Sequence, residues 1–342
     1  MRLNTSILFS FAVLLTSIGV YACSGDSSNP PSGVTDGGDT EHADAASLDS
    51  GSTEDGEDGG VENDAASPAD AGPELACDPT KPFAAPVEVV ELNAIPSGFA
   101  RLTPDMLTVY FHAGASEDAI RLYRATRTNT TEPFGTPTRL AGLTSGAGEG
   151  MASEHASMPA VTPNQLGLFF QSRRAGGGTS LVNLWSTSRT STDAPFDAPT
   201  PVASLNDSLN TGQPFVTANG TSLYYSPRRG TGADMRVRIH RASLSGIVVN
   251  APVEVAELTS SERNEAPVLS ADELTIYFAR DYTIWSASRP DTESAFANLA
   301  PAGIANETGN DFPSWISPDD CVLYLTSSRS GTNKIYTATR PR

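Results

Sequence analysis

Acidic and basic residues recur at matching places in the second part of the sequence, from residue 81 onward. Pairs that contain an acid or an amide stand just before short apolar segments: Glu154-His155, Asn264-Glu265 and Asn310-Asp311. Arginines follow the next such segment: Arg173, Arg174, Arg228, Arg229, Arg280 and Arg329. Two carboxylates that flank a sugar can hydrolyse a glycosidic bond, and guanidinium groups bind carboxylates, phosphates or a peptide terminus. Hydrolysis and ligand binding are therefore the two chemistries to consider.

The elements that carry these residues belong to an internal repeat. The segment "FPSWISPDDCVLYLTSSRSGTNKIYTATR", residues 312–340, has four relatives that begin at Phe99, Met158, Gln213 and Ala266. One turn recurs at Pro104, Pro163, Ala218, Ala271 and Pro318, at intervals of 59, 55, 53 and 47 residues. Each copy holds three short apolar or alternating segments separated by turn residues, which is typical of β-strands. The sequence therefore predicts an all-β repeat protein.

A fourth strand follows the third in every copy except the last. Its sequences begin at Pro133, Pro195, Val249 and Ala295, whereas only Pro341 and Arg342 follow Arg340. A matching segment, "PFAAPVEVVELN", occupies residues 82–93, ahead of the first copy. In a closed ring this segment completes the last sheet, so that no sheet edge stays open. We therefore predict a five-bladed β-propeller that is closed by the N-terminal strand, which completes the last blade.

The copies resemble the blades of the TolB-like, WD-repeat-like β-propeller family. The resemblance spans the whole repeat region and is strongest in the last copy, at Asn310-Asp311, Pro313, Trp315, Ser317-Pro318-Asp319, Arg329, Gly331 and Asn333-Ile335-Tyr336. The glycine that this family places after Pro-Asp occurs here only as Gly220. The resemblance implies a protein of the cell envelope that interacts with other proteins, without indicating a specific partner.

In a propeller, the loops between strands four and one and between strands two and three lie on one face. We therefore expect the candidate residues to meet around one mouth of the central channel: Glu154, His155, Arg174, Arg229, Asn264, Glu265, Arg280, Asn310, Asp311 and Arg329. Residues repeated in several blades are usually structural, and we favour that interpretation for the arginines. The function that we expect is non-catalytic binding or scaffolding. A glycan-active hydrolase that uses Glu154, Glu265 and Asp311 is the alternative.

The N-terminal residues predict export and a lipid anchor. The apolar run from Ile7 to Val20 has fourteen residues, which is shorter than the roughly 20 that span a bilayer and suits a signal peptide over residues 1–22. The sequence "VYAC", residues 20–23, resembles the lipobox of bacterial lipoproteins and implies lipidation of Cys23; an ordinary cleaved signal that contains a cysteine is the alternative. We expect the protein to be anchored in the outer membrane and to face the periplasm or the cell surface.

Residues 24–80 contain 15 Asp or Glu and no Lys or Arg. Because a segment with charge of one sign and little apolar content has nothing to bury, residues 23–80 predict a disordered, acidic tether. The propeller is then expected over residues 81–342. Their formal charge is only −4 of the total −18, whereas a nucleic-acid ligand would need a basic face, so we expect no nucleic acid.

The sequence has three cysteines, and Cys77 and Cys321 remain once Cys23 is assigned to the lipid anchor. Disulfides form in the compartments that receive exported proteins. In a propeller blade, the turn between strands one and two lies on the same face as the start of strand four. Cys321 lies in that turn of the last blade, and Cys77 precedes the strand that closes it. We therefore predict a Cys77–Cys321 disulfide; two free thiols are the alternative.

The remaining motifs give no indication of a bound metal ion or cofactor. The histidines His42, His112, His155 and His240 show no metal-ligand spacing, so we expect no metal site. The glycine-rich stretch "AGGGT", residues 175–179, joins two strands and opens no helix, so it is not expected to cradle a phosphate, and we expect no cofactor. We expect a monomer whose partners are a membrane, through the lipid, and a protein, peptide or glycan ligand.

Overall fold

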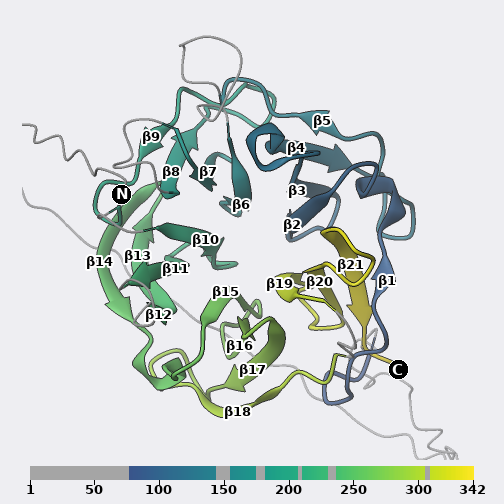
Figure 1. Ribbon diagram of the computed structural model, residues 1–342, viewed down its shortest axis with the longest axis vertical. Helices are drawn as coiled ribbons and strands as arrows, with labels where there is room; N and C mark the ends of the chain where they lie inside the picture. The colour runs from purple at the N-terminus through teal and green to yellow at the C-terminus, as the bar shows by residue number, and fades with distance from the viewer. Residues whose placement is uncertain (1–76, 144–154, 175–181, 207–209, 230–235, 305–308) are drawn as a thin grey trace, which may run out of the picture. The chain divides into compact units, whose positions relative to one another are not determined.

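The computed structural model describes residues 77–143, 155–174, 182–206, 210–229, 236–304 and 309–342 of the 342-residue chain. These residues form five antiparallel sheets set around a common axis, as Figure 1 shows. In each sheet, or blade, the first strand lies nearest the axis and the last strand lies at the rim. The protein is therefore an all-β, five-bladed propeller, which confirms the prediction from the repeat.

The first four blades follow the order of the chain. Blade 1 contains β2 (Ser97–Leu102), β3 (Thr108–Ala113), β4 (Arg121–Thr126) and β5 (Thr138–Arg139). Blade 2 contains β6 (Ser157–Val161), β7 (Gly167–Ser172), β8 (Asn183–Ser188) and β9 (Thr200–Pro201). Blade 3 contains β10 (Thr211–Val216), β11 (Ser222–Arg229), β13 (His240–Ser245) and β14 (Val248–Glu254), and the short β12 (Arg236–Val237) pairs with β11. Blade 4 contains β15 (Asn264–Leu269), β16 (Thr275–Arg280), β17 (Thr283–Ser288) and β18 (Ala297–Pro301). Short 3-10 helices lie in connections at η1 (Val90–Leu92), η2 (Glu117–Ala119) and η5 (Ala256–Leu258).

Blade 5 combines segments from both ends of the described chain. Its first three strands are β19 (Asp311–Ile316), β20 (Val322–Ser327) and β21 (Lys334–Thr339), and its fourth is β1 (Val87–Glu88). β1 pairs antiparallel with β21, so that Val87 lies opposite Thr337. Figure 1 shows β1 beside β21 at the rim of the ring. The N-terminal strand therefore completes the last blade, as the sequence predicts.

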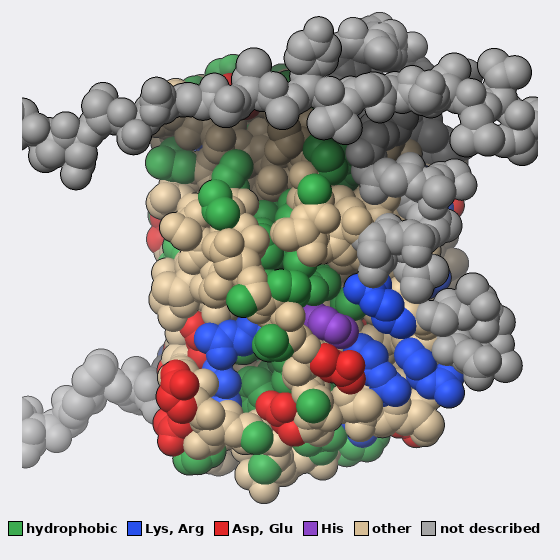
Figure 2. Space-filling view, turned by 90° about the vertical axis from the view of Figure 1, so that its left-hand side faces the viewer, with side chains coloured by type: hydrophobic (Ala, Val, Ile, Leu, Met, Phe, Trp, Pro, Cys, Tyr) green, Lys and Arg blue, Asp and Glu red, His purple; other side chains and the backbone are tan. Residues whose placement is uncertain are grey.

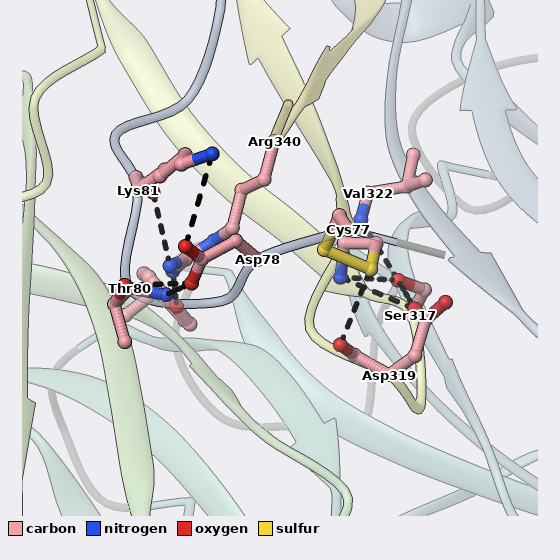
Figure 3. The surroundings of a disulfide bond; sticks show 10 residues. Cys77, Asp78, Thr80, Lys81, Ser317, Asp319, Val322 and Arg340 are labelled. Carbon is pink, nitrogen blue, oxygen red and sulfur yellow. Dashed lines mark hydrogen bonds and ion pairs between the residues drawn. A yellow bond between two sulfur atoms is a disulfide. The ribbon is translucent and has the colours of Figure 1, made fainter. Parts of the chain in front are cut away.

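A disulfide joins Cys77 to Cys321, the pair that the topology predicts. Both cysteines are buried, and their Cα atoms lie 5.6 Å apart. Figure 3 shows the bridge between the segment before β1 and the turn between β19 and β20. Next to it, the Asp78 N–H donates to the Pro341 carbonyl at 3.0 Å. Because a disulfide restrains the unfolded chain, a bridge of this kind typically contributes about 2–4 kcal/mol to stability.

The turn between the first and second strands has the same hydrogen bonds in all five blades. A Ser or Thr hydroxyl donates to an Asp or Asn two residues later and accepts the N–H five residues later; the pairs are Thr103–Asp105, Thr162–Asn164, Thr217–Asn219, Ser270–Asp272 and Ser317–Asp319. The next residue is left-handed, with φ between 57° and 72°, at Met106, Gln165, Gly220, Glu273 and Asp320. This conformation favours glycine, so the side-chain hydrogen bonds hold four other residues in it. The turn type therefore does not depend on the family's glycine.

An arginine at the end of the third strand joins neighbouring blades at four of the five joins. Each guanidinium carbon lies 4.3–4.5 Å from the centre of a phenylalanine ring of its own blade, in the pairs Arg127–Phe134, Arg189–Phe196, Arg289–Phe296 and Arg340–Phe83. Each arginine also interacts with a tyrosine of the preceding blade: Tyr324, Tyr110, Tyr224 and Tyr277, respectively. Phe83 belongs to the N-terminal segment, so this Tyr-Arg-Phe group also holds the ring closed.

All three members of the Tyr-Arg-Phe group are replaced together at the join between blades 2 and 3. Phe169 takes the place of the tyrosine, Leu244 that of the arginine and Val249 that of the phenylalanine. The Leu244 N–H bonds the Thr221 carbonyl, just as the Arg127 N–H bonds the Leu107 carbonyl. The three substitutes pack in one apolar cluster. A buried arginine without its polar partner would be destabilising, so the three positions behave as one unit.

We expect Tyr277 and Arg340 to be coupled energetically. The Arg340 Nη2 donates to the Tyr277 hydroxyl at 2.7 Å, and loss of either partner leaves a buried polar group unpaired, which costs about 1–3 kcal/mol. Urea unfolding of Tyr277→Phe, Arg340→Leu and the double variant should give a coupling energy of about 0.5–3 kcal/mol. Phe169→Tyr and Leu244→Arg, at the apolar join, are the matched controls and should each destabilise alone. Additive losses for Tyr277 and Arg340 would contradict the idea of a unit.

Candidate functional site

The predicted site residues lie at strand ends that share one face of the ring. Asn264 and Glu265 begin β15 opposite Arg280 and Ala279 at the end of β16. Asp311 begins β19 opposite Ser327, the last residue of β20. The remaining described candidates lie at or next to equivalent strand ends: His155, Arg174, Arg229, Asn310 and Arg329. Glu154 lies outside the described residues.

Both described carboxylates of the predicted site are buried in ion pairs. Glu265 is 3% exposed; its Oε1 lies 2.6 Å from the Arg263 Nη2, and its Oε2 accepts a hydrogen bond from the Gln213 Nε2 at 2.8 Å. Asp311 is 1% exposed, and its Oδ2 accepts a hydrogen bond from the Arg329 Nη2 at 2.9 Å. A buried carboxylate is costly unless a cation and hydrogen bonds compensate it. Each arginine therefore stabilises the acid that it contacts.

The predicted arginines contact aromatic rings of their own blades. The guanidinium carbon of Arg280 lies 4.7 Å from the centre of the Trp285 ring. Those of Arg174 and Arg329 each lie 5.2 Å from a ring centre, that of Trp185 and that of Tyr336, respectively. The Nε atoms of these three arginines donate at 2.9 Å to Asn264, Ser172 and Ser327, respectively. The Arg229 Nη1 donates to the Arg228 carbonyl. These internal contacts recur from blade to blade, which supports the structural interpretation of the arginines.

A bulge in the innermost strands shapes the mouth of the channel. The register of the first two strands shifts in every blade, and in four blades the residue at the bulge is left-handed, with φ between 52° and 56°: Phe99, Met158, Gln213 and Ala266. Each of these four residues donates its backbone N–H to a side chain of the preceding blade, at 2.7–3.3 Å. The acceptors, in the same order, are Thr326, His112, Gln171 and Gln213. We refer to these four hydrogen bonds as the inter-blade latches.

The join between blades 4 and 5 lacks both halves of a latch. Pro313 stands at the bulge position and has no N–H to donate. Ala279 stands where Thr326, His112 and Gln171 stand in other blades, and its side chain accepts no hydrogen bond. Gly212 shows how closely a latch approaches, since a Cβ there would lie 1.9 Å from the Gln171 Oε1. The latch is therefore a paired device, like the Tyr-Arg-Phe group.

His112 is a latch residue whose role the sequence did not reveal. Its Nδ1 accepts the Met158 N–H at 3.1 Å, and its ring stacks on Phe99 with the centres 5.7 Å apart. An Nδ1 that accepts must be unprotonated. Burial, with a smaller effect from His155, lowers the pKa of His112 to about 3. Burial, followed by the charge of Arg173, lowers the pKa of His155 to about 4. Both histidines are therefore neutral near pH 7.

Aromatic rings form a row along the mouth from blade 4 to blade 1. The Tyr282 ring meets Phe312 edge-on, with the centres 5.9 Å apart, and Phe312 lies 5.9 Å from Phe99, which stacks on His112. Sequence reasoning missed this row because its members come from different strands and loops. Phe99 and Phe312 stand at or next to the bulge, so an alignment of the innermost strands residue by residue is the signal that could have found them.

A polar pocket of about 290 Å³ lies on this face and is lined by residues of blades 1 to 4. Acidic, basic and amide side chains line it: Glu117, Gln171, Arg173, Gln213, Arg228 and Glu265. Arg173 and Glu117, both in the lining, form an ion pair. Of the sequence candidates only Glu265 lines this pocket, together with two of the repeat's arginines, whereas the two glutamines were missed. A pocket with donors and acceptors of both charge signs suits a polar ligand.

Other features of the described residues limit the chemistry of the surface. Figure 2 views the ring from the side and shows acidic and basic side chains interspersed, with a histidine, in the lower half of that view. No group of three or more His, Cys, Asp or Glu in the described ranges could hold a metal ion. Within the same ranges, no helix has the length and apolar character needed to cross a membrane.

Comparisons with known proteins identify similar folds. No protein-family model and no curated protein matches the sequence. A GH43_1 enzyme from Xanthomonas citri is similar over 74% of this chain and 90% of its own, with 14% identity and a TM-score of 0.53. TolB from Acinetobacter baumannii is similar over 76% of this chain, with 15% identity and a TM-score of 0.42, and the chain spans only 55% of its length. A protein of Agrobacterium tumefaciens described as TolB gives 17% identity and a TM-score of 0.44 over 68% of this chain and 69% of its own. At these identities the likeness concerns the fold alone.

We expect stability to fall with acidity because of His112. Its pKa is about 6.5 in an unfolded chain and about 3 in the folded protein. Between these values only the unfolded state takes up the proton, so stability is full above pH 6.5 and declines as the pH falls toward 3. The decline is at most about 1.4 kcal/mol per pH unit for each such histidine.

His112→Gln and His112→Ala separate titration from the latch itself. Gln171 already serves as the acceptor at this position in blade 2, so the glutamine variant should match the wild type near pH 7.5 and lose less stability toward pH 4. The alanine variant should lose about 1–3 kcal/mol at every pH, because the Met158 N–H loses its acceptor. Urea unfolding at several pH values measures both effects. Equal slopes for the wild type and His112→Gln would contradict the assignment.

Proposed function

We propose that the propeller binds a ligand and does not catalyse a reaction on it. The observation that carries this proposal is the pairing of Glu265 with Arg263 and of Asp311 with Arg329, each in a buried ion pair. A glycosidase needs one carboxyl group as a proton donor and a second carboxylate that attacks or activates water. Carboxylates that are engaged with an arginine and buried are poorly suited to either role. They are well suited to holding the mouth in one shape.

The ligand is a protein, peptide or glycan that presents polar groups to the pocket lined by Gln171, Arg173, Arg228 and Glu265. The inter-blade latches hold Gln171 and Gln213 in place, so the pocket is formed before the ligand arrives. A preformed site loses less conformational entropy on binding. This favours recognition by hydrogen bonds of a ligand rich in hydroxyl or amide groups.

A lipid on Cys23 and the acidic segment that follows would display this propeller at the outer membrane, toward the periplasm or the cell surface. The support is the sequence "VYAC" and the one-signed charge of residues 24–80. Cys23→Ser, expressed in full length, should move the protein from the membrane fraction to the soluble fraction and abolish labelling by a radioactive fatty acid. A membrane-bound, unlabelled wild type would contradict lipidation, and so would an unchanged distribution of the variant.

A glycan-active hydrolase is the second candidate. Two carboxylates, Glu117 and Glu265, line the same polar pocket, and the fold is similar to that of a GH43_1 enzyme. In this alternative Glu265 leaves its ion pair when the sugar binds. Since acids at these strand starts are part of the repeat, the binding function is the simpler account.

One set of measurements separates the two functions. Oligosaccharides and short peptides are titrated calorimetrically into the full-length protein, and chromogenic arabinosides, xylosides and glucosides are tested for turnover. We expect saturable binding without turnover. Arg228→Gln should weaken binding about tenfold or more, because a hydrogen bond to a charged group is lost.

Arg139→Gln is the matched control, since Arg139 lies on the outer strand β5 and does not line this pocket. Its affinity should equal that of the wild type. Turnover that Glu265→Gln abolishes would establish the hydrolase in place of the binding protein. Absence of any binding, or equal weakening by both arginine variants, would refute the proposed pocket.

A further inference from the structure

The opposite end of the central channel is apolar and contains one buried arginine. A pocket of about 150 Å³ lies there, and every blade contributes to its lining, with Leu102, Ala160, Phe215, Leu269 and Trp315 among the lining residues. Its rim contains the turn residues Pro104, Ala218, Ala271 and Pro318, which are exposed to solvent. This pocket is separate from the polar pocket of the other mouth, since the two share no lining residue.

Arg101 is the one charged residue that lines this apolar pocket. Its side chain is 3% exposed and reaches from blade 1 to its neighbours. The Nε donates to the Pro159 carbonyl at 3.3 Å and the Nη2 to the Pro214 carbonyl at 3.0 Å, in blades 2 and 3. The guanidinium carbon lies 5.0 Å from the centre of the Phe215 ring. Carbonyls and a ring hold the group in place but bring no negative charge.

The Arg101 guanidinium is incompletely satisfied. Its Nη1 is buried and makes no hydrogen bond to any residue that the structure describes. No acid lines the pocket, and no ion pair involves Arg101 in the described ranges. Burial lowers the pKa of Arg101 to about 9, so the group is still a cation at neutral pH. A buried cation without a counter-charge is costly, and an anion at Nη1 would remove most of that cost.

The geometry points to a binding site for a small apolar carboxylate in the turn-side end of the channel, with the Arg101 Nη1 as the donor to the carboxylate. A carboxylate forms strong, charge-assisted hydrogen bonds with a guanidinium group. Apolar walls favour an aliphatic or aromatic remainder, and they disfavour phosphate, whose several strongly hydrated oxygens would find only one free donor. The pocket resembles in size a cavity of about 150 Å³ that holds benzene, which indicates a ligand as small as benzoate or a short fatty acid.

Two sources could supply the carboxylate, a free acid or the C-terminus of an apolar peptide, and the test includes both. Benzoate and hexanoate are titrated into the full-length protein, with tryptophan fluorescence and calorimetry as readouts, beside benzamide, hexanol and chloride at equal ionic strength. An apolar tripeptide is added with a free and with an amidated C-terminus. We expect saturable binding of carboxylates and at least about tenfold weaker binding of the uncharged analogues.

Variants connect the binding to Arg101. Arg101→Met should abolish the preference for benzoate over benzamide, and Arg139→Met, on the outer strand, should retain it. If Arg101→Met does not fold, Ala271→Phe gives the same test, because a ring at the exposed rim should block entry without removing the arginine. Equal affinity for benzoate and benzamide, stronger binding of chloride than of benzoate, or unchanged affinity in Ala271→Phe would overturn the proposal. None of these results depends on the polar pocket of the other mouth.

Discussion

The ring of five sheets is closed by a strand from the other end of the chain, since β1 completes the last sheet by pairing with β21. Two paired residues, Val87 and Glu88, could not hold the ring alone. Neighbouring contacts reinforce them, since the Ala84 N–H bonds the Thr339 carbonyl at 2.7 Å, Phe83 stacks under Arg340, and Cys77 is joined to Cys321. Backbone, side-chain and covalent contacts thus reinforce the same seam, which is the contact of β1 and the segment before it with the other strands of blade 5. The arrangement of both channel mouths depends on this seam, since each mouth is lined by residues from several blades.

The joins between blades use two devices, and each is present or absent as a whole. The Tyr-Arg-Phe group is missing at the join of blades 2 and 3, where Phe169, Leu244 and Val249 form an apolar cluster instead. The latch is missing at the join of blades 4 and 5, where Pro313 has no N–H to donate and Ala279 no acceptor. A half-satisfied polar pair is worse than an apolar contact. That energetic asymmetry explains why partners that are far apart in sequence change together within one chain.

The sequence was sufficient to predict the fold, the closing strand and the Cys77–Cys321 pair, because hydrophobic spacing and turn residues repeat in columns and the topology follows from counting them. The repeat pattern also located the strand ends that carry Glu265 and Asp311. What it could not supply is the bulge, since the left-handed residues there are Phe99, Met158, Gln213 and Ala266, and no glycine marks them. The latch role of His112 and the row from Tyr282 to Phe99 follow from that bulge. Arg101 was invisible for another reason: at its position the other blades carry Ala160, Phe215, Val268 and Trp315, so it belongs to no repeated pattern.

Compensation of buried charge distinguishes Arg101 from the buried ion pairs of the blades. Glu265 has Arg263, Asp311 has Arg329, and Glu273 lies 3.8 Å from the Arg289 Nη2. Each of these pairs completes itself within the protein, as expected for residues that serve the fold. Arg101 instead contacts two carbonyls and a ring, and one of its nitrogen atoms is left over. If Arg101 only connected three blades, an uncharged donor such as glutamine would serve at lower cost. The free-energy cost of desolvating a cation is larger than that of desolvating an amide. The charge is therefore better explained by the proposed carboxylate ligand, which would enter the channel through the exposed, apolar rim on the turn side.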